Sequence, residues 1–130
     1  GCAAAVAAID VYKEENLIEN SKKMGAILGE LLEEMKEKHK SVGDVRYIGL
    51  FSSIELVRDR ETKEPLVPYA MDPDGIMKKI GSILKSEGFW NYSHDHMLIV
   101  APPLTINEEQ LREAMVIMDR VLDYVDKLIG

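Results

Sequence analysis

The stretch MLIVAPPLTINEEQLREAM, residues 97–115, contains a strand signal, a stop signal and a helix start in immediate succession. Its first residues are apolar and partly β-branched, which favours a strand. The paired prolines Pro102 and Pro103 end that strand, because proline has no N–H to donate to a neighbouring strand. Asn107 and Gln110 have the spacing of a capping box, which satisfies free backbone N–H groups at a helix start. We therefore predict a strand followed by a capped helix.

Apolar residues that recur every three or four positions predict four helices along the chain. A first helix is expected over Ala3–Asn16, and the clearest apolar stripe follows over Leu17–Lys40, either continuous with the first helix or separated from it. A third helix is expected over Pro73–Ser86 with Asp72 as its N-cap. The last helix runs from Asn107 to the end of the chain. Five methionines fall on these apolar faces and are expected to fill gaps in the core: Met24, Met35, Met77, Met115 and Met118.

Two segments between the helices have the composition of strands. Residues 45–57, VRYIGLFSSIELV, alternate partly around Gly49 and predict two short strands or one strand with a bulge. Residues 89–104, FWNYSHDHMLIVAPPL, have a polar SHDH centre and predict a hairpin. The charged, proline-bearing residues 58–75 are expected to form an exposed connection. Helices that flank a small, mainly antiparallel sheet define an α+β fold class.

Composition limits the classes of protein to which the chain can belong. A length of 130 residues suits one compact domain, residues 1–130, with a modest core. A net charge of -7 would repel a phosphate backbone, so nucleic acid is not an expected partner. The single cysteine, Cys2, forms no internal disulfide and is expected to be a small core residue of an alanine-rich helix.

The first residues, GCAAAVAAIDVYKEEN, have neither a positively charged leader nor a long apolar span. We therefore expect no signal peptide and no membrane segment, and a reducing cytoplasm fits the cysteine content best. The chain opens inside a helical pattern without a capping residue. This opening is expected of a piece cut from a longer protein.

The local sequence His94-Asp95-His96 would place two imidazoles on one face of a strand, because residues two apart point the same way. Zinc needs further ligands, and neither a CxxC nor an HExxH motif supplies them. The alternatives are a solvated turn and the lining of a neighbouring pocket. The glutamates within residues 30–37 lie among lysines at helical spacing, which is typical of a solvated helix face. We assign no catalytic, cofactor-binding or metal-ligating residue.

Three stretches together resemble one family of enzymes. CAAAVAAIDVYKEENLIEN, residues 2–20, has an alanine run followed by the phrase EENL.EN. VGDVRYIGLFSSIELVRDRETKEP, residues 42–65, is similar to the pattern vgdVRG.GL followed by iELV. LIVAPPLTINEEQLREAM, residues 98–115, is similar to iaPPL followed by a capped helix. The chain resembles the class III pyridoxal-phosphate-dependent aminotransferases over essentially its whole length.

The resemblance implies a fold and a division of labour. The fold would be that of the C-terminal domain of aspartate-aminotransferase-like (fold type I) PLP enzymes. A large domain upstream of Gly1 would carry the Schiff-base lysine and bind pyridoxal 5'-phosphate, and no cofactor is expected on this fragment. The full-length homodimer would transfer an amino group from an amino acid or amine to a 2-oxo acid. The fragment alone would be inactive and would shape substrate specificity and closure, with an omega-amino acid or a taurine/pyruvate pair as the favoured substrate class.

Two departures from the family pattern affect the expected substrate site. Tyr47 stands where the family has a glycine after the arginine, and Arg46, which matches, is expected to be structural. Residues 89–100 contain no arginine, although some relatives place a carboxylate-binding arginine there. The polar residues that remain are interpreted either as solvated turn residues or as contacts to the distal group of the amino donor: Asn91, His94 and His96.

Two other readings of the residues remain open. One is a free-standing α+β ligand-binding or regulatory module without catalysis. The other is an oligomerisation domain built on the long helix, although its apolar stripe does not hold the heptad spacing of a coiled coil. A small domain separated from a larger one would expose apolar surface, so self-association is expected.

Overall fold

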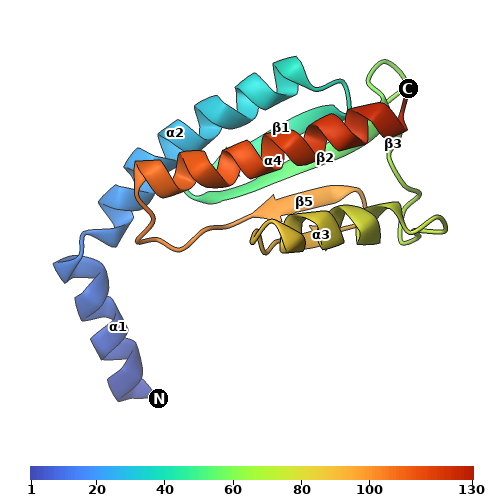
Figure 1. Ribbon diagram of the computed structural model, residues 1–130. Coiled ribbons are helices and arrows are strands. Elements are labelled where there is room, and N and C mark those ends of the chain that lie inside the picture. Colours follow the sequence, from blue (N-terminus) through green and yellow to red (C-terminus); the bar gives the residue numbers. More distant parts are fainter.

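An antiparallel sheet forms the centre of the structure, a computed structural model that describes residues 1–130 (Figure 1). Its main strands lie in the order β1-β2-β5-β4, and β3 pairs with β2. The strands are β1 (Val42–Ile48), β2 (Phe51–Asp59), β3 (Glu64–Pro65), β4 (Tyr92–His94) and β5 (Met97–Val100). The helices are α1 (Cys2–Glu14), α2 (Leu17–Lys38), α3 (Ile76–Ser86) and α4 (Glu108–Leu128). The predicted α+β fold class is confirmed.

Strands β1 and β2 are two strands joined by a tight turn at Gly49, which confirms the first of the two predicted arrangements. Gly49 has φ of 54°, in the left-handed region that glycine adopts without steric cost. The turn also lies against helix α2, where a Cβ on Gly25 would come within 2.5 Å of the Gly49 carbonyl oxygen. Two glycines therefore let the backbones of helix and turn approach closely.

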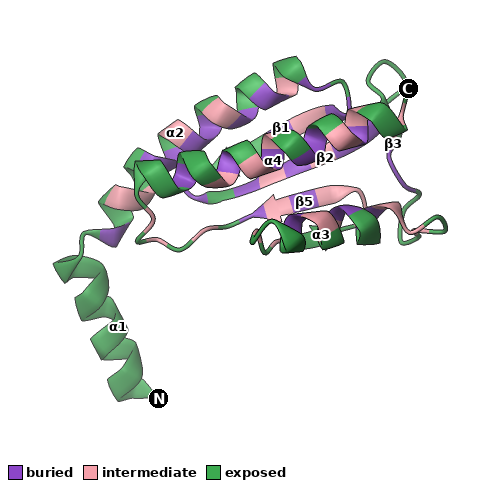
Figure 2. Cartoon of the chain, in the orientation of Figure 1, coloured by how far each residue is buried: buried purple, intermediate pink, exposed green.

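Helices α2, α3 and α4 lie on the same side of the sheet (Figure 1). Alternate residues of β2 and β5, including Ile54, Leu56 and Leu98, point toward these helices and are fully buried. The helices bury apolar stripes against them, as the purple segments of Figure 2 show. All five methionines predicted to lie in the core are buried: Met24, Met35, Met77, Met115 and Met118.

No helix covers the opposite face of the sheet (Figure 1). Strand register places Arg46 beside Ser53, and it places Glu55 beside Met97. Because directly opposed residues point to the same side of a sheet, these side chains and their neighbours line one surface. We call it the bare face, and its residues are Asp44, Arg46, Ile48, Phe51, Ser53, Glu55, Tyr92, His94, Met97 and Ile99.

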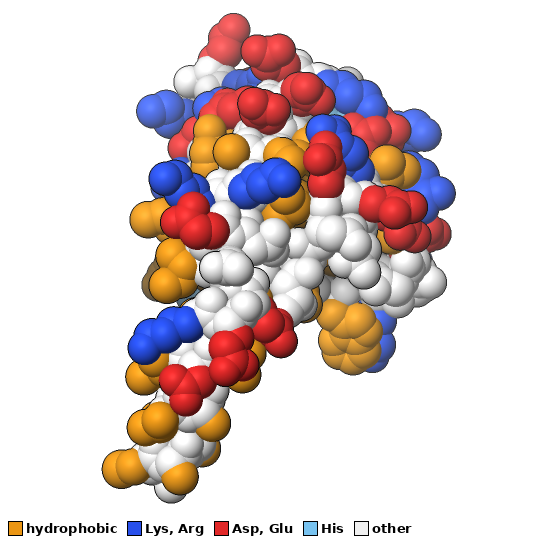
Figure 3. All heavy atoms as spheres, turned by 90° about the vertical axis from the view of Figure 1, so that its left-hand side faces the viewer, with side chains coloured by type: hydrophobic (Ala, Val, Ile, Leu, Met, Phe, Trp, Pro, Cys, Tyr) orange, Lys and Arg blue, Asp and Glu red, His pale blue; other side chains and the backbone are white.

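Helix α1 is separate from α2 and projects from the rest of the chain (Figure 1). Asn16 has φ of 51° and breaks the helical run between them. No residue of α1 is buried, and Figure 3 shows hydrophobic side chains along this projecting helix. Cys2 is exposed, so its predicted place in the core is wrong, because no other part of the chain packs over the start of the helix.

Helix α3 begins at Ile76, three residues later than predicted. Gly75 precedes it with φ of 66°, so Pro73 lies in the loop and Asp72 is not the N-cap. The Asp72 carboxylate still accepts from the backbone N–H groups of Met77 at 3.3 Å and Lys78 at 3.1 Å. Asp72 therefore still satisfies N–H groups of the first turn, although it lies in the loop before the helix.

The connection between β2 and α3 is only partly exposed. Leu66 and Val67 within it are buried, and Glu64–Pro65 forms the short strand β3 against β2. The expectation of a wholly exposed connection is wrong, because its two apolar residues after Pro65 reach the sheet and helices. By contrast, the capping box of α4 is confirmed, with Asn107 and Gln110 bonded reciprocally at 2.9 and 3.2 Å.

Tyr47 occupies the position where the family pattern has glycine, and helix α2 accommodates it. The Tyr47 ring lies over Gly29, where a Cβ would come within 2.5 Å of the ring carbon Cε2. The absence of a side chain at Gly29 therefore makes room for the ring. Tyr47 keeps its regular pairing with Ser52 on the neighbouring strand, so the departure from the family pattern does not disturb the sheet.

Candidate functional site

The bare face carries a polar cluster that spans three strands. The Arg46 Nη2 donates to the Glu55 Oε2 at 2.7 Å and lies 3.7 Å from the Met97 Sδ. On the other side, His96 Nε2 lies 3.4 Å from the Glu55 Oε1. The second ring nitrogen of His96, Nδ1, is buried without a hydrogen-bond partner. Glu55 therefore joins a strand arginine to the turn histidine.

The turn between β4 and β5 is fixed by Asp95. This residue has φ of 51°, and its Oδ1 accepts from the Ala70 backbone N–H at 2.8 Å. The other oxygen, Oδ2, lies 3.0 Å from His94 Nδ1. The Asp95 side chain is largely buried, whereas the His94 side chain is 54% exposed. The carboxylate thus anchors the turn to the loop before α3 and leaves most of the imidazole open to solvent.

The three predicted site residues share one hairpin but have separate partners. His94 faces Asp95, and His96 faces Glu55. Asn91 makes one long contact, from Nδ2 to the Tyr92 carbonyl oxygen at 3.4 Å. The predicted hairpin and its turn are confirmed. Each imidazole has its own carboxylate, which is not the arrangement of two ligands on one metal ion.

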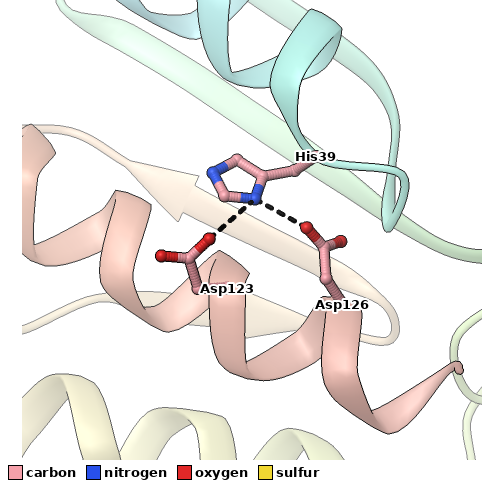
Figure 4. Close-up of side chains that lie close together, drawn as sticks. All are labelled: His39, Asp123 and Asp126. Carbon is pink, nitrogen blue, oxygen red and sulfur yellow. Dashed lines mark hydrogen bonds and ion pairs between the residues drawn. The ribbon is translucent and has the colours of Figure 1, made fainter.

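A second polar cluster lies between the end of α2 and helix α4 (Figure 4). His39 follows α2 and is fully buried. Its Nδ1 lies 2.8 Å from the Asp126 Oδ2 and 3.8 Å from the Asp123 Oδ1, and its Nε2 lies 2.8 Å from the Asp119 Oδ1. An imidazole that carries both ring protons can donate to both near carboxylates, whereas a neutral ring can donate to only one.

The two carboxylates nearest His39 are held in their charged form. Burial alone would raise the pKa of Asp119, but hydrogen bonds from Lys38 and His39 outweigh burial and leave the pKa below its usual value. Burial opposes ionisation of Asp126 as well, and donation from Ser41 and from the His39 ring lowers its pKa in the same way. The cluster is therefore a network of opposite charges.

We interpret this network as a structural link and not as a metal site. His39, Asp123 and Asp126 could in principle supply three ligand atoms. However, His39 Nδ1 already lies at hydrogen-bond distance from Asp126, and Lys38 balances Asp119 with a contact of 2.5 Å. Close by, Arg60 donates to backbone carbonyl oxygens that end α2 and begin β1: Lys36, His39 and Val42.

Sequence reasoning missed the cluster around His39. The available signal was the spacing of Asp119, Asp123 and Asp126, which places three acidic side chains on one side of a helix. Nothing local connects them with a histidine that lies 80 or more residues earlier in the chain.

The chain does not supply a site for covalently bound PLP. Such a site needs a lysine nucleophile in a desolvated pocket. No lysine of this chain is buried. The cofactor therefore does not fit on these residues alone.

None of the helices combines the length and the apolar character that crossing a membrane requires.

A solved structure places this fold among the fold type I PLP enzymes. The taurine:2-oxoglutarate aminotransferase from Bifidobacterium kashiwanohense, in complex with PLP and glutamate, matches 99% of this chain with a TM-score of 0.93 and 40% sequence identity. The matched part is 29% of that protein. The small sheet with helices on one side is thus one part of a larger enzyme in that protein.

The chain belongs to the class III aminotransferase family, whose model matches residues 1–122. An ethanolamine-phosphate phospho-lyase homolog of Caenorhabditis elegans is 36% identical over 97% of this chain and 26% of its own length. A taurine--pyruvate aminotransferase of Bilophila wadsworthia is 35% identical over 100% of this chain and 29% of its own length. The chain therefore spans between a quarter and a third of these relatives, and members of the family use PLP.

Proposed function

We propose that this chain, residues 1–130, is the C-terminal small domain of a PLP-dependent aminotransferase. The whole enzyme would transfer an amino group from an amino acid or amine to a 2-oxo acid. The observation that carries the proposal is the match over 99% of the chain to an aminotransferase structure that holds PLP and glutamate. Since no lysine here is buried, the remainder of the protein supplies the lysine nucleophile.

The bare face gives the domain its part in the reaction. The bound cofactor supplies an electron sink for the substrate's reacting carbon. This domain contributes orientation of the substrate and exclusion of water when it closes. We place the bare face and the turn between β4 and β5 toward the substrate, because the helices already occupy the other side of the sheet.

On this hairpin, one of Asn91, His94 and His96 would donate a hydrogen bond to the distal group of the amino donor. Of the three, His94 is the most accessible to a substrate, because its side chain is 54% exposed. His96 is partly shielded and engaged with Glu55. Asn91 has only its long contact to a neighbouring carbonyl oxygen, so its amide is nearly free to bind.

The first experiment is a transamination assay of the full-length protein loaded with PLP. Taurine, β-alanine and 4-aminobutyrate serve as amino donors, with pyruvate or 2-oxoglutarate as the acceptor. We expect measurable transfer from at least one donor, and no activity from the 130-residue chain alone. Full-length protein that binds PLP but transfers no amino group from any donor would contradict the proposal.

Alanine variants then test the hairpin residues in the full-length enzyme. His94→Ala, His96→Ala and Asn91→Ala are compared by the Michaelis constant for the best donor. Ser82→Ala is the control, because Ser82 is exposed on α3 and bonds only to the Lys78 carbonyl oxygen of its own helix. We expect one hairpin variant to raise this constant several-fold. Unchanged constants for all three would remove these residues from the substrate site.

A second candidate activity is elimination of phosphate from an amino alcohol phosphate. The phospho-lyase homolog of C. elegans, at 36% identity over 97% of this chain, favours it. The same PLP chemistry can release a leaving group from the carbon beside the reacting carbon. Release of inorganic phosphate from ethanolamine phosphate, without any 2-oxo acid, would identify this activity and would exclude a strict aminotransferase. A free-standing regulatory module is not favoured by the family match.

We further propose that the full-length protein is a cytoplasmic homodimer. Helix α1 supports this proposal, because it exposes the apolar side chains Val6, Ile9 and Tyr12 and buries none of its residues. Such a surface is suited to contact with a second subunit. Light scattering on the eluted full-length protein measures its mass directly. A monomer at micromolar concentration would contradict the dimer. The isolated chain is expected to self-associate through the same apolar side chains.

A further inference from the structure

Arg46 is the only arginine or lysine whose own strand position belongs to the bare face. Lys36 reaches Asp44 from helix α2, and Arg60 and Lys63 line a pocket with Asp44 and Glu55 at the edge of this face.

The Arg46 guanidinium is always charged at physiological pH and carries five N–H donors. Only Nη2 has partners within the chain, namely Glu55 Oε2 and the sulfur of Met97. The side chain is 57% exposed, so Nε and Nη1 remain free to donate to an incoming group.

Glu55 holds the guanidinium from one side without enclosing it. The contact is a single 2.7 Å hydrogen bond, and the second oxygen of Glu55 is occupied by His96. An exposed ion pair of this kind adds little to stability. Its evident effect is to fix the direction of a charged group on an otherwise open surface.

Arg46 also lies in the row of side chains that leads to the hairpin. The register runs from Arg46 through Ser53 and Ile99 to Tyr92 on strand β4. Residues 89–100 contain no arginine, so the hairpin itself offers no permanent positive charge. Arg46 is the cation of the bare face that lies in the row leading to the hairpin.

We propose that Arg46 binds the distal carboxylate or sulfonate of the amino donor, a role that rests on the aminotransferase function proposed above. The free Nε and Nη1 donate to the anion while Nη2 stays on Glu55. Arg46 then determines specificity for donors that carry a distal negative charge. This role differs from the purely structural one that the sequence pattern indicates for the same residue.

The test compares charged and uncharged donors in the full-length, PLP-loaded enzyme. The rate of the donor half-reaction is measured without acceptor, for β-alanine, taurine and propylamine. Propylamine has the chain length of β-alanine but no anionic group. Charge-assisted hydrogen bonds contribute about 1.5–3 kcal/mol, or roughly 10–150-fold in kcat/KM. Arg46→Gln should lower kcat/KM for the better of the two anionic donors by about that factor and change propylamine less than about 2-fold.

Arg120→Gln is a matched control. Arg120 Nη2 contacts the Glu87 Oε2 at 2.7 Å, its side chain is 60% exposed, and it lies on helix α4, away from the bare face. Its removal should leave all three donors unchanged. Arg46→Lys should recover only part of the lost rate, because an ammonium group does not reproduce the planar fork of a guanidinium.

Each result is interpretable. A selective loss for anionic donors supports the inference, and normal propylamine turnover shows that the variant is folded. An equal loss for propylamine and β-alanine would make Arg46 structural and overturn the inference. No change in Arg46→Gln would overturn it as well. A wild-type enzyme that transfers no amino group from any donor would refute the proposed function itself.

Discussion

Replacing His39 with alanine should lower the free energy of unfolding by about 2–4 kcal/mol. The side chain makes two hydrogen bonds to carboxylates, each at 2.8 Å, and bonds to charged groups are worth about 1.5–3 kcal/mol each. Water can replace part of this loss, because the side chains of Asp119 and Asp126 are 31% and 20% exposed. The result should therefore fall short of the roughly 3–5 kcal/mol found when a fully buried ion pair loses one partner.

Urea unfolding of the 130-residue chain, followed by far-ultraviolet circular dichroism at pH 7, measures this free energy. His94→Ala is the control, because that imidazole is 54% exposed in a turn and its loss should cost less than about 0.5 kcal/mol. A double-mutant cycle with Asp126→Asn should show a coupling of about 1 kcal/mol or more, since the two residues are in contact. A cost below about 0.5 kcal/mol for His39→Ala would refute the interpretation of the cluster as a structural link.

Three further predictions concern the same chain. The pKa of Asp126 is lowered in the folded state, so the stabilisation that its charged form provides is complete above the usual carboxyl range and is lost as the pH falls below about 4. The difference in unfolding free energy between wild type and Asp126→Asn should therefore be smaller below that pH than at about pH 7. Gly29→Ala should cost about 1–3 kcal/mol, because the new Cβ would meet the Tyr47 ring, and Tyr47→Gly in the same chain should recover most of that cost. Asn107→Ala should cost about 1 kcal/mol by removing the capping box of α4, as measured by the same unfolding experiment.

Local patterns predicted most of the elements. The capping box at Asn107 and the hairpin over residues 89–104 depend on residues within a few positions of one another, and both are present. The predicted start of α3 was wrong, because Gly75 adopts a left-handed conformation and the helix begins after it, although Asp72-Pro73 favours a helix start. The prediction that Cys2 lies in the core was wrong, because burial of α1 depends on what packs against the helix, and composition does not indicate this.

The polar contacts were the least predictable feature. His39 meets Asp119 and Asp126 across 80 and 87 positions, and Arg46 meets Met97 across 51. Such pairs are set by the way helices and strands pack, so periodicity along the chain carries no signal for them. The candidate residues His94 and His96 could be placed on a turn, but their separate carboxylate partners became evident only from the folded arrangement.

The two faces of the sheet should therefore respond differently to substitution. The helical face is closed by an apolar core and by the His39 network, so changes there act on folding and are read in the unfolding free energy. The bare face has an exposed arginine and histidine whose ion pairs contribute little to stability, so changes there should leave the chain folded. Under the proposed function, these changes are expected to alter the choice of amino donor. Because the sheet is one layer thick, residues that alternate along β2 belong to different faces: Ile54 points into the core, and Glu55 points to the surface that holds Arg46. Substitutions at these neighbouring positions should separate stability from specificity within a single strand.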